Sequence, residues 1–256
     1  MSNSVLIFGL IGWFVLLAAA EAISAPAREE RDTHSDQRLI TNFSLTALAL
    51  VLASLLPLAN LGASWVSTKY GLGLGSRVPL PWFATFALLL LSMTFVAYWV
   101  HRAMHRAPLL WRVHRVHHAD SAVDVSTSLR NHPLELAVSL PASAVVILLL
   151  RPPVSAVVAV QTAIFAATLW QHAAVALPKS VDRALARVLV TPRVHRLHHH
   201  PERGTHDSNY GEILIVWDLM FRTFNPEERR GPVGLEGQGA RANVLIDQIC
   251  SPLRAA

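Results

Sequence analysis

Five long apolar runs constrain what this chain can fold into. They cover residues 4–20, 39–61, 81–100, 134–150 and 154–170. Each is long enough for a helix to cross the hydrocarbon core of a bilayer, which takes about 17–25 residues. Because backbone groups in lipid must be satisfied internally, such runs fold as helices. Charged residues make up only 15% of the chain, against about 25% in soluble domains. The sequence therefore predicts an all-α integral membrane helical bundle.

The segments between the runs predict how the helices are connected. No Lys or Arg precedes the first run, so it lacks the basic region of a signal peptide and we expect a first helix with an external N-terminus. Residues 21–38 are expected to form a polar loop. Pro57 is expected to kink or end the second run, and glycines favour a loop over residues 62–79. Residues 151–153, Arg-Pro-Pro, predict a helical hairpin from the last two runs, either spanning or re-entrant.

Histidines gather in one part of the sequence. Of the 13 histidines, only His34 lies outside the window from His101 to His206. Three clusters, HRAMH, HRVHH and HRLHHH, space their histidines at i, i+3 or i+4, which places them on one face of a helix. Neutral imidazole binds Zn, Fe, Cu and Ni, and one ion takes roughly three to five such ligands. Eight clustered and two single histidines therefore predict two metal ions sharing one pocket.

The other residues of the chain narrow the choice of metal chemistry. Structural zinc sites usually contain cysteine, and Cys250 is the only one here. The zinc-protease motif HExxH is absent. Nitrogen-rich ligation with open positions favours redox-active iron and O2 chemistry. Two alternatives stay open: a His-rich membrane metal-binding or transport protein, which would place ligands at mid-membrane, and a zinc-dependent hydrolase.

Basic residues predict the orientation in the membrane. Residues 101–133 and 171–256 hold 5 and 11 Lys or Arg, whereas residues 62–79 hold two, Lys69 and Arg77. By the positive-inside rule, the histidine clusters face the cytoplasm. We interpret these basic residues as membrane-flanking and expect no nucleic-acid partner. The expected location is a bacterial inner membrane.

Five motifs, in order, carry a family resemblance. HRAMH, LWRVHRVHHAD, STSLRNHPLE, WQHAAVALP and TPRVHRLHHHPERGTHDSNYGEILIVWDLMFRTF, from about residue 95 to 224, resemble the fatty acid hydroxylase/sterol desaturase superfamily. Leu219 and Arg222 stand where that superfamily has Arg and Gly, so the local turn is expected to differ. The resemblance implies N-terminal membrane helices (1–80), a catalytic domain (81–225) and a cytosolic tail (226–256). It also implies a non-haem di-iron membrane enzyme that uses O2 to hydroxylate, or desaturate, a lipid, fatty acyl or sterol-like substrate.

The resemblance also implies which residues hold the metal. The ligands carried over are His101, His105, His114, His117, His118, His132, His172, His195, His198 and His199. Four residues are candidates for hydrogen bonds that orient the ligand rings: Asp120, Glu135, Asp207 and Asn209. His200 lies about 140° from His195 on a helical wheel and is expected off the ligand face. His206 is expected in a loop, with a structural or ring-orienting role.

Turnover of such an enzyme requires two electrons from outside the chain. The sequence has neither a dinucleotide-binding GxGxxG motif nor a haem domain, so we expect an external donor such as a ferredoxin. The lipid is expected to enter from the bilayer, between the third run and the hairpin. Hydroxylation is the preferred reaction, because it needs only oxygen rebound and no second positioned hydrogen.

Overall fold

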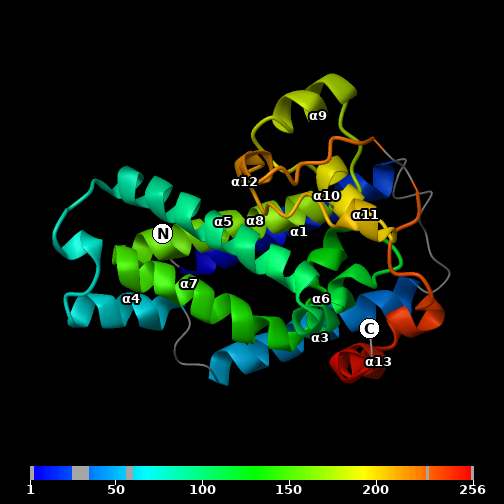
Figure 1. Ribbon diagram of the computed structural model, residues 1–256, viewed down its shortest axis with the longest axis horizontal. Coiled ribbons are helices and arrows are strands. Elements are labelled where there is room, and N and C mark those ends of the chain that lie inside the picture. Colours follow the sequence, from blue (N-terminus) through cyan, green and yellow to red (C-terminus); the bar gives the residue numbers. More distant parts are fainter. Residues whose placement is uncertain (1–2, 25–34, 56–59, 229–230, 255–256) are drawn as a thin grey trace.

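The computed structural model describes residues 3–24, 35–55, 60–228 and 231–254, and these are mostly helical with no β-strand among them (Figure 1). The long helices are α1 (Asn3–Ile23), α3 (Ser35–Leu55), α5 (Trp82–Arg106), α7 (Leu136–Leu150) and α8 (Val154–His172). The shorter ones are α4 (Asn60–Lys69), α6 (Pro108–His118), α9 (Lys179–Leu185), α10 (Pro192–His198), α11 (Arg203–His206), α12 (Val216–Met220) and α13 (Leu245–Ile249). Five 3-10 turns complete the set: η1 (Leu74–Ser76), η2 (Val125–Leu129), η3 (Pro133–Glu135), η4 (Gly239–Asn243) and η5 (Ser251–Leu253). The prediction of an all-α bundle is confirmed.

Four of the described helical segments are long and apolar enough to cross a membrane: Ser4–Ile23, Trp82–Arg106, Pro133–Leu150 and Val154–His172. They match four of the five predicted runs. The second run forms α3, which is not among the four. The reason lies in its first half, where Arg38, Thr41 and Asn42 are buried and hydrogen-bonded to polar loops. Pro57 and His34 lie outside the described residues, as does most of the predicted 21–38 loop.

Helices α5 and α6 carry the first five clustered histidines. As predicted, α5 continues without a break from its apolar part through His101 and His105. It ends at Arg106 because the next residue, Ala107, precedes a proline and is extended, with φ −88° and ψ 120°. Pro108 then starts α6 at a position where no backbone N–H is needed. The turn places the α6 histidines beside those of α5.

Helices α7 and α8 form the predicted hairpin. Arg151 at the turn has φ +50°, and two prolines follow it. The side chains of Leu89, Ile147 and Val157 are fully buried where α5, α7 and α8 meet. The sequence predicted a loop over residues 62–79, but this segment contains most of α4 and all of η1. Both elements pack against α7. Gly73 permits this packing, since a Cβ there would lie 2.5 Å from the Leu148 carbonyl oxygen.

Short helices form a cap over one end of the long ones, visible at the right of Figure 1. The segment predicted as a cytosolic tail is part of this packing. Thr41 of α3 donates to the Asn243 carbonyl at 2.8 Å, and Arg115 of α6 donates to the Ser251 hydroxyl at 2.9 Å. The predicted domain boundary at residue 225 stays a prediction, but η4 and α13 pack against α3, and η5 packs against α6.

Candidate metal centre

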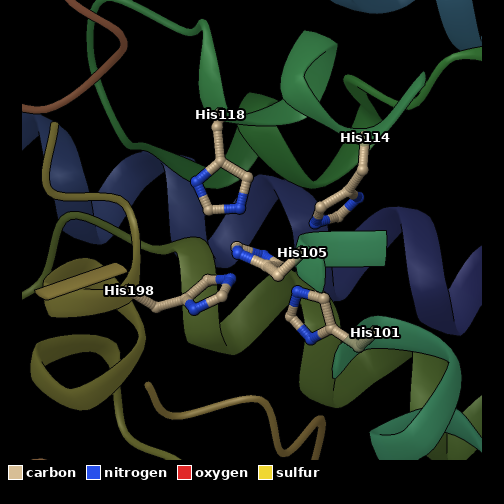
Figure 2. A group of neighbouring side chains, drawn as sticks. All are labelled: His101, His105, His114, His118 and His198. Atoms are coloured by element: carbon tan, nitrogen blue, oxygen red, sulfur yellow. The ribbon is translucent and has the colours of Figure 1, made fainter. Parts of the chain in front are cut away.

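Nine histidines converge in two neighbouring groups inside the cap. Ring nitrogens within each group all lie within 4.8 Å of one another. The first group, drawn in Figure 2, comprises His101, His105, His114, His118 and His198. The second group comprises His117, His172, His195 and His199. Rings of the two groups are in contact, for example His118 and His199 with centroids 4.7 Å apart. The geometry fits two metal ions side by side.

Helical geometry divides each HxxHH cluster between the groups. Residues four apart on a helix differ by about 40° around its axis, whereas adjacent residues differ by about 100°. His114 and His118 of α6 therefore face the first group and His117 the second. Likewise, His195 and His199 share the second group and His198 joins the first. The sequence predicted that all three histidines of a cluster share one ligand face. The structure instead divides each cluster between two groups.

Distances in the second group match those of ligands on one ion. The Nε2 atom of His172 lies 3.1 Å from that of His117 and 2.9 Å from that of His195. The Nε2 atoms of His195 and His199 are 3.3 Å apart. Nitrogens that bind one ion at about 2.1 Å and at right angles lie about 3.0 Å apart. A neutral ring has one N–H only, so a shared cation satisfies this row of nitrogens better than hydrogen bonds between rings do.

Backbone carbonyls fix the orientation of four rings. Each ring donates its Nδ1–H to one carbonyl oxygen: His101 to Tyr210 at 2.9 Å, His117 to Arg130 at 3.2 Å, His172 to Thr168 at 2.7 Å and His198 to Ser208 at 2.7 Å. Because a carbonyl only accepts, Nδ1 carries the proton and Nε2 keeps its lone pair for a metal. The Nε2 atoms of His101 and His198 are buried and have no partner among the described residues.

Burial keeps the rings of the cap neutral. Desolvation lowers the pKa well below 6.5 for five of them: His117, His118, His195, His198 and His199. Neutral imidazole is the form that binds metal. Both nitrogens of His118 are buried without a hydrogen-bond partner in the described part of the chain. Since such groups destabilise a fold by about 1–3 kcal/mol each, the donor set fits bound cations.

Two of the four predicted carboxylate and amide residues contact ligand rings. Glu135 Oε2 lies 3.3 Å from His114 Nδ1, and Asp207 Oδ1 lies 3.4 Å from His105 Nδ1. These carboxylates can accept a ring N–H and orient it.

The other two candidates, Asp120 and Asn209, make hydrogen bonds elsewhere. Asp120 accepts hydrogen bonds from Arg38, Asn42 and Thr127, and so ties α3 to η2. Asn209 donates to the carbonyls of Val194 and Asn225, and it fixes the backbone instead of a ring.

His132 stands apart from both groups. Its Nδ1 accepts from the Leu134 N–H at 3.1 Å, and its Nε2 donates to the Ile249 carbonyl at 3.1 Å. With both nitrogens engaged, the ring caps η3 and has no lone pair left for a metal. We therefore propose that His132 caps η3 and is not a metal ligand, in place of the role that the resemblance implies.

The last two histidines of the window lie beside the groups. As expected, His200 belongs to neither, and its Nδ1 accepts from the Glu202 N–H at 3.2 Å. His206 ends α11 and is not in a loop as expected. A ring nitrogen of His206 lies within 4.8 Å of one in His105, and the ring stacks on Trp111 with centroids 5.3 Å apart.

Asp218 holds the loop that supports His101. Its carboxylate accepts the N–H groups of Tyr210 and Gly211, both at 2.8 Å, and the Thr223 hydroxyl at 2.7 Å. Tyr210 in turn presents its carbonyl to His101. Close by, Arg222 has φ +57°. Arg222 thus adopts the left-handed backbone conformation that glycine favours. For a residue with a Cβ, this conformation lowers the stability of the fold by about 1–2 kcal/mol.

A cavity of about 540 Å³ opens beside both groups. Its wall includes five histidines: His101 and His114 of the first group, and His117, His172 and His195 of the second. The rest of the wall is largely apolar and comes mainly from α3, α5, α7 and α8. The volume lies in the range of small-molecule pockets, about 300–1,000 Å³. An apolar molecule in this cavity meets the histidine groups at one end, which we call the metal end.

Comparison with known proteins identifies similar chains. The family model described as "Fatty acid hydroxylase" matches residues 86–223. The human alkylglycerol monooxygenase is 32% identical over 157 residues, which are 61% of this chain and 33% of the human protein. The Danio rerio alkylglycerol monooxygenase is 35% identical over 61% of this chain and 34% of its own. The ornithine lipid hydroxylase OlsE of Rhizobium tropici is 27% identical over 62% of this chain and 47% of its own. The chain thus spans a third to a half of these relatives. No solved structure matches the chain.

Proposed function

Because the chain belongs to the fatty acid hydroxylase family, whose model covers more than half of it, we propose that it is a membrane-bound, O2-dependent oxidoreductase that hydroxylates a lipid. One observation carries the proposal. Two adjoining groups of buried histidines form part of the wall of an apolar cavity. Such a cavity can hold an unreactive hydrocarbon against a redox metal. The names of the relatives, alkylglycerol monooxygenase and ornithine lipid hydroxylase, support hydroxylation over desaturation.

The proposed cofactor is two iron ions. Five ligands would hold the first ion: His101, His105, His114, His118 and His198. Four would hold the second: His117, His172, His195 and His199. Imidazole is a suitable ligand for iron. With histidine ligands, iron can keep open coordination positions for O2. When bound, the two ions would supply the activation of O2 that attack on a C–H bond requires.

The chain's own residues orient the ligand rings and line the cavity for the substrate. Glu135 is hydrogen-bonded to the His114 ring, Asp207 lies beside the His105 ring, and backbone carbonyls orient four other rings. The cavity wall from α5, α7 and α8 would admit a lipid from the bilayer, as the sequence predicts. Electrons would come from an external donor of the ferredoxin type. We place the histidine groups on the cytoplasmic side of a bacterial inner membrane, since Lys and Arg concentrate at that end.

The two alternative functions account less well for the geometry. A transport path would place ligands through the middle of the spans, whereas the groups lie at the ends of α5 and α8 and in the cap. Zinc metalloproteases supply their general base from an HExxH motif, which this sequence does not contain.

The test is turnover of purified, iron-loaded protein in lipid with ferredoxin and reductant under ¹⁸O2. The expected product is a lipid alcohol that carries one ¹⁸O atom. The matched variants are His118→Ala, which should abolish turnover, and His200→Ala, which should retain it. An unlabelled alkene would identify a desaturase. No product, together with zinc in protein isolated from native cells, would contradict the proposal.

A further inference from the structure

The short helix α12 lies beside the apolar part of α5 and not beyond its end (Figure 1). The Trp217 indole N–H donates to the Thr94 hydroxyl at 3.1 Å, and the Trp217 and Phe95 rings have centroids 5.1 Å apart. One turn further along α5, the Tyr98 and Thr223 hydroxyls are hydrogen-bonded at 2.9 Å. Because α5 is long and apolar enough to cross a membrane, the level of these contacts gives the depth of α12.

The first charged residue of α5 marks where its apolar part ends. That residue is Arg102, and a helix rises about 30 Å from Trp82 to Arg102, which is the thickness of the hydrocarbon core. The Arg102 guanidinium reaches back to the Tyr98 hydroxyl at 3.3 Å, so we place the headgroup boundary between these two residues. Thr94 comes one to two turns earlier, about 6–12 Å inside that boundary. Trp217, which is bonded to Thr94, therefore lies at the depth of lipid acyl chains.

The exposed side of α12 is apolar. Three of its five residues are exposed: Val216 by 38%, Leu219 by 51% and Met220 by 60%. Its one charged residue, Asp218, is fully buried. The aromatic residues of α5 that contact this segment, Phe95 and Trp99, are exposed as well, so the two apolar surfaces are continuous. Contact with hydrocarbon is more favourable for such a surface than contact with water.

The backbone around α12 also suits a lipid environment, in which polar groups must be paired within the protein. Four N–H groups donate to carbonyls at 2.8–3.1 Å: those of Ile215, Leu219, Phe221 and Thr223. The Asp218 carboxylate accepts the N–H groups of Tyr210 and Gly211. These hydrogen bonds leave the apolar side chains as the outer surface of the segment.

We propose that α12 is embedded in the leaflet on the side of the histidine groups, with Val216, Leu219 and Met220 against lipid acyl chains, although no predicted apolar run includes it. The partner of this surface is the hydrocarbon of the bilayer. On the buried side of the same helix, Asp218 accepts the N–H of Tyr210, whose carbonyl orients His101. The leaflet therefore contacts the helix that positions a proposed ligand. The inference concerns depth alone and does not depend on the proposed function.

The experiment measures the surroundings of single fluorescent labels on the whole chain in lipid nanodiscs, where both membrane faces are open to solvent. Cys250→Ser removes the only cysteine of the chain, and Met220→Cys then carries a bimane label. Two quenchers are compared: phosphatidylcholine brominated on its acyl chains, and iodide in water. The brominated lipid should quench the Met220 label. Iodide should quench it at least about fivefold less than a label in water, because ions are excluded from the hydrocarbon core.

Two further variants in the same background are the matched controls. Leu91→Cys lies on α5, three residues before Thr94, and Leu91 is 45% exposed, so its label reports acyl chains. Gly204→Cys lies on α11, where an added Cβ meets no atom within 4 Å, so its label reports water. Leu219→Cys repeats the measurement at a second position of α12 and carries the test if Met220→Cys does not fold.

Labels at Met220 and Leu219 that behave like the Leu91 label would support the inference. Iodide quenching similar to that of the Gly204 label, without quenching by the brominated lipid, would overturn it and place α12 in water. Strong quenching by both reagents would also overturn it, since that result places α12 among the headgroups. Failure of the proposed function would appear separately, as absence of turnover or of iron.

Discussion

Replacement of Asp218 by Asn tests whether hydrogen bonds to the backbone at Tyr210 and Gly211 position the His101 ring. Asp218 is fully buried, and its carboxylate accepts from the N–H groups of Tyr210 and Gly211 through different oxygens. An amide of the same shape has one oxygen and one NH2 group. In either orientation, one of the two backbone N–H groups then faces a donor. The shape is kept while one acceptor and the negative charge are lost, so the effect reports on these charge-assisted hydrogen bonds.

The magnitude follows from the bonds that are lost. A hydrogen bond to a charged acceptor contributes about 1.5–3 kcal/mol, and a buried donor left unsatisfied costs about 1–3 kcal/mol. We therefore expect Asp218→Asn to lower the free energy of unfolding by about 2–4 kcal/mol. The Tyr210 carbonyl would no longer be held against His101. Loss of such an orienting partner lowers metal affinity about 10–100-fold, and the loss should fall on the first group.

The assay combines thermal unfolding with iron titration of the metal-free protein. The control is Asp36→Asn, which removes an exposed carboxylate from the first turn of α3. That change should cost less than about 1 kcal/mol and leave iron binding unchanged. Equal weakening of both iron-binding steps in Asp218→Asn, or unchanged stability, would refute the reasoning.

The remaining predictions concern ligands, pH, strain and topology. His118→Ala and His117→Ala should each remove one of two bound irons, whereas His132→Ala should keep both; iron analysis decides, and loss of iron from the His132 variant would contradict its capping role. Since burial lowers the pKa of histidines such as His198 below the unfolded value of 6.5, the metal-free protein should lose stability as pH falls below 6.5, by up to about 1.4 kcal/mol per histidine and pH unit; a flat melting temperature from pH 8 to 5 would argue against neutral buried rings. Arg222→Gly should raise the free energy of unfolding by about 1 kcal/mol, since it relieves a φ of +57°, and an unchanged melting temperature would show that the turn is unstrained. Reporters near Ala122 and Leu74 should read cytoplasmic and external respectively, and a cytoplasmic signal at Leu74 would contradict the orientation.

The sequence predicted the helices whose signal is continuous hydrophobicity. The runs that became α1, α5, α7 and α8 are predominantly apolar, so their length and mean hydropathy identified them. Prediction was weaker for α3, because its run of apolar residues includes polar side chains such as Asn42, whose hydrogen-bond partner Asp120 lies far away in sequence. The helix α4 was missed because a glycine-containing stretch favours a loop locally, while packing against α7 decides its structure.

The sequence predicted which residue type forms the candidate site, but it did not predict how the histidines are divided between two groups. Spacing identified the clustered histidines, but the division of His117 from His118 depends on where two neighbouring centres lie in space. The single histidines His132 and His172 look alike in sequence. Long-range contacts distinguish them, because His132 meets the Ile249 carbonyl and His172 joins the second group. The carbonyls that orient four rings carry no residue signature at all, because every residue has one.

The most direct test of the two-centre account is anomalous diffraction at the iron edge from crystals of protein purified with its native metal. The account predicts two iron peaks in each chain. One should lie about 2.1 Å from nitrogens of His101, His105, His114, His118 and His198, and the other at the same distance from those of His117, His172, His195 and His199. A single peak, a zinc signal at either position, or a peak bound to His132 would contradict it.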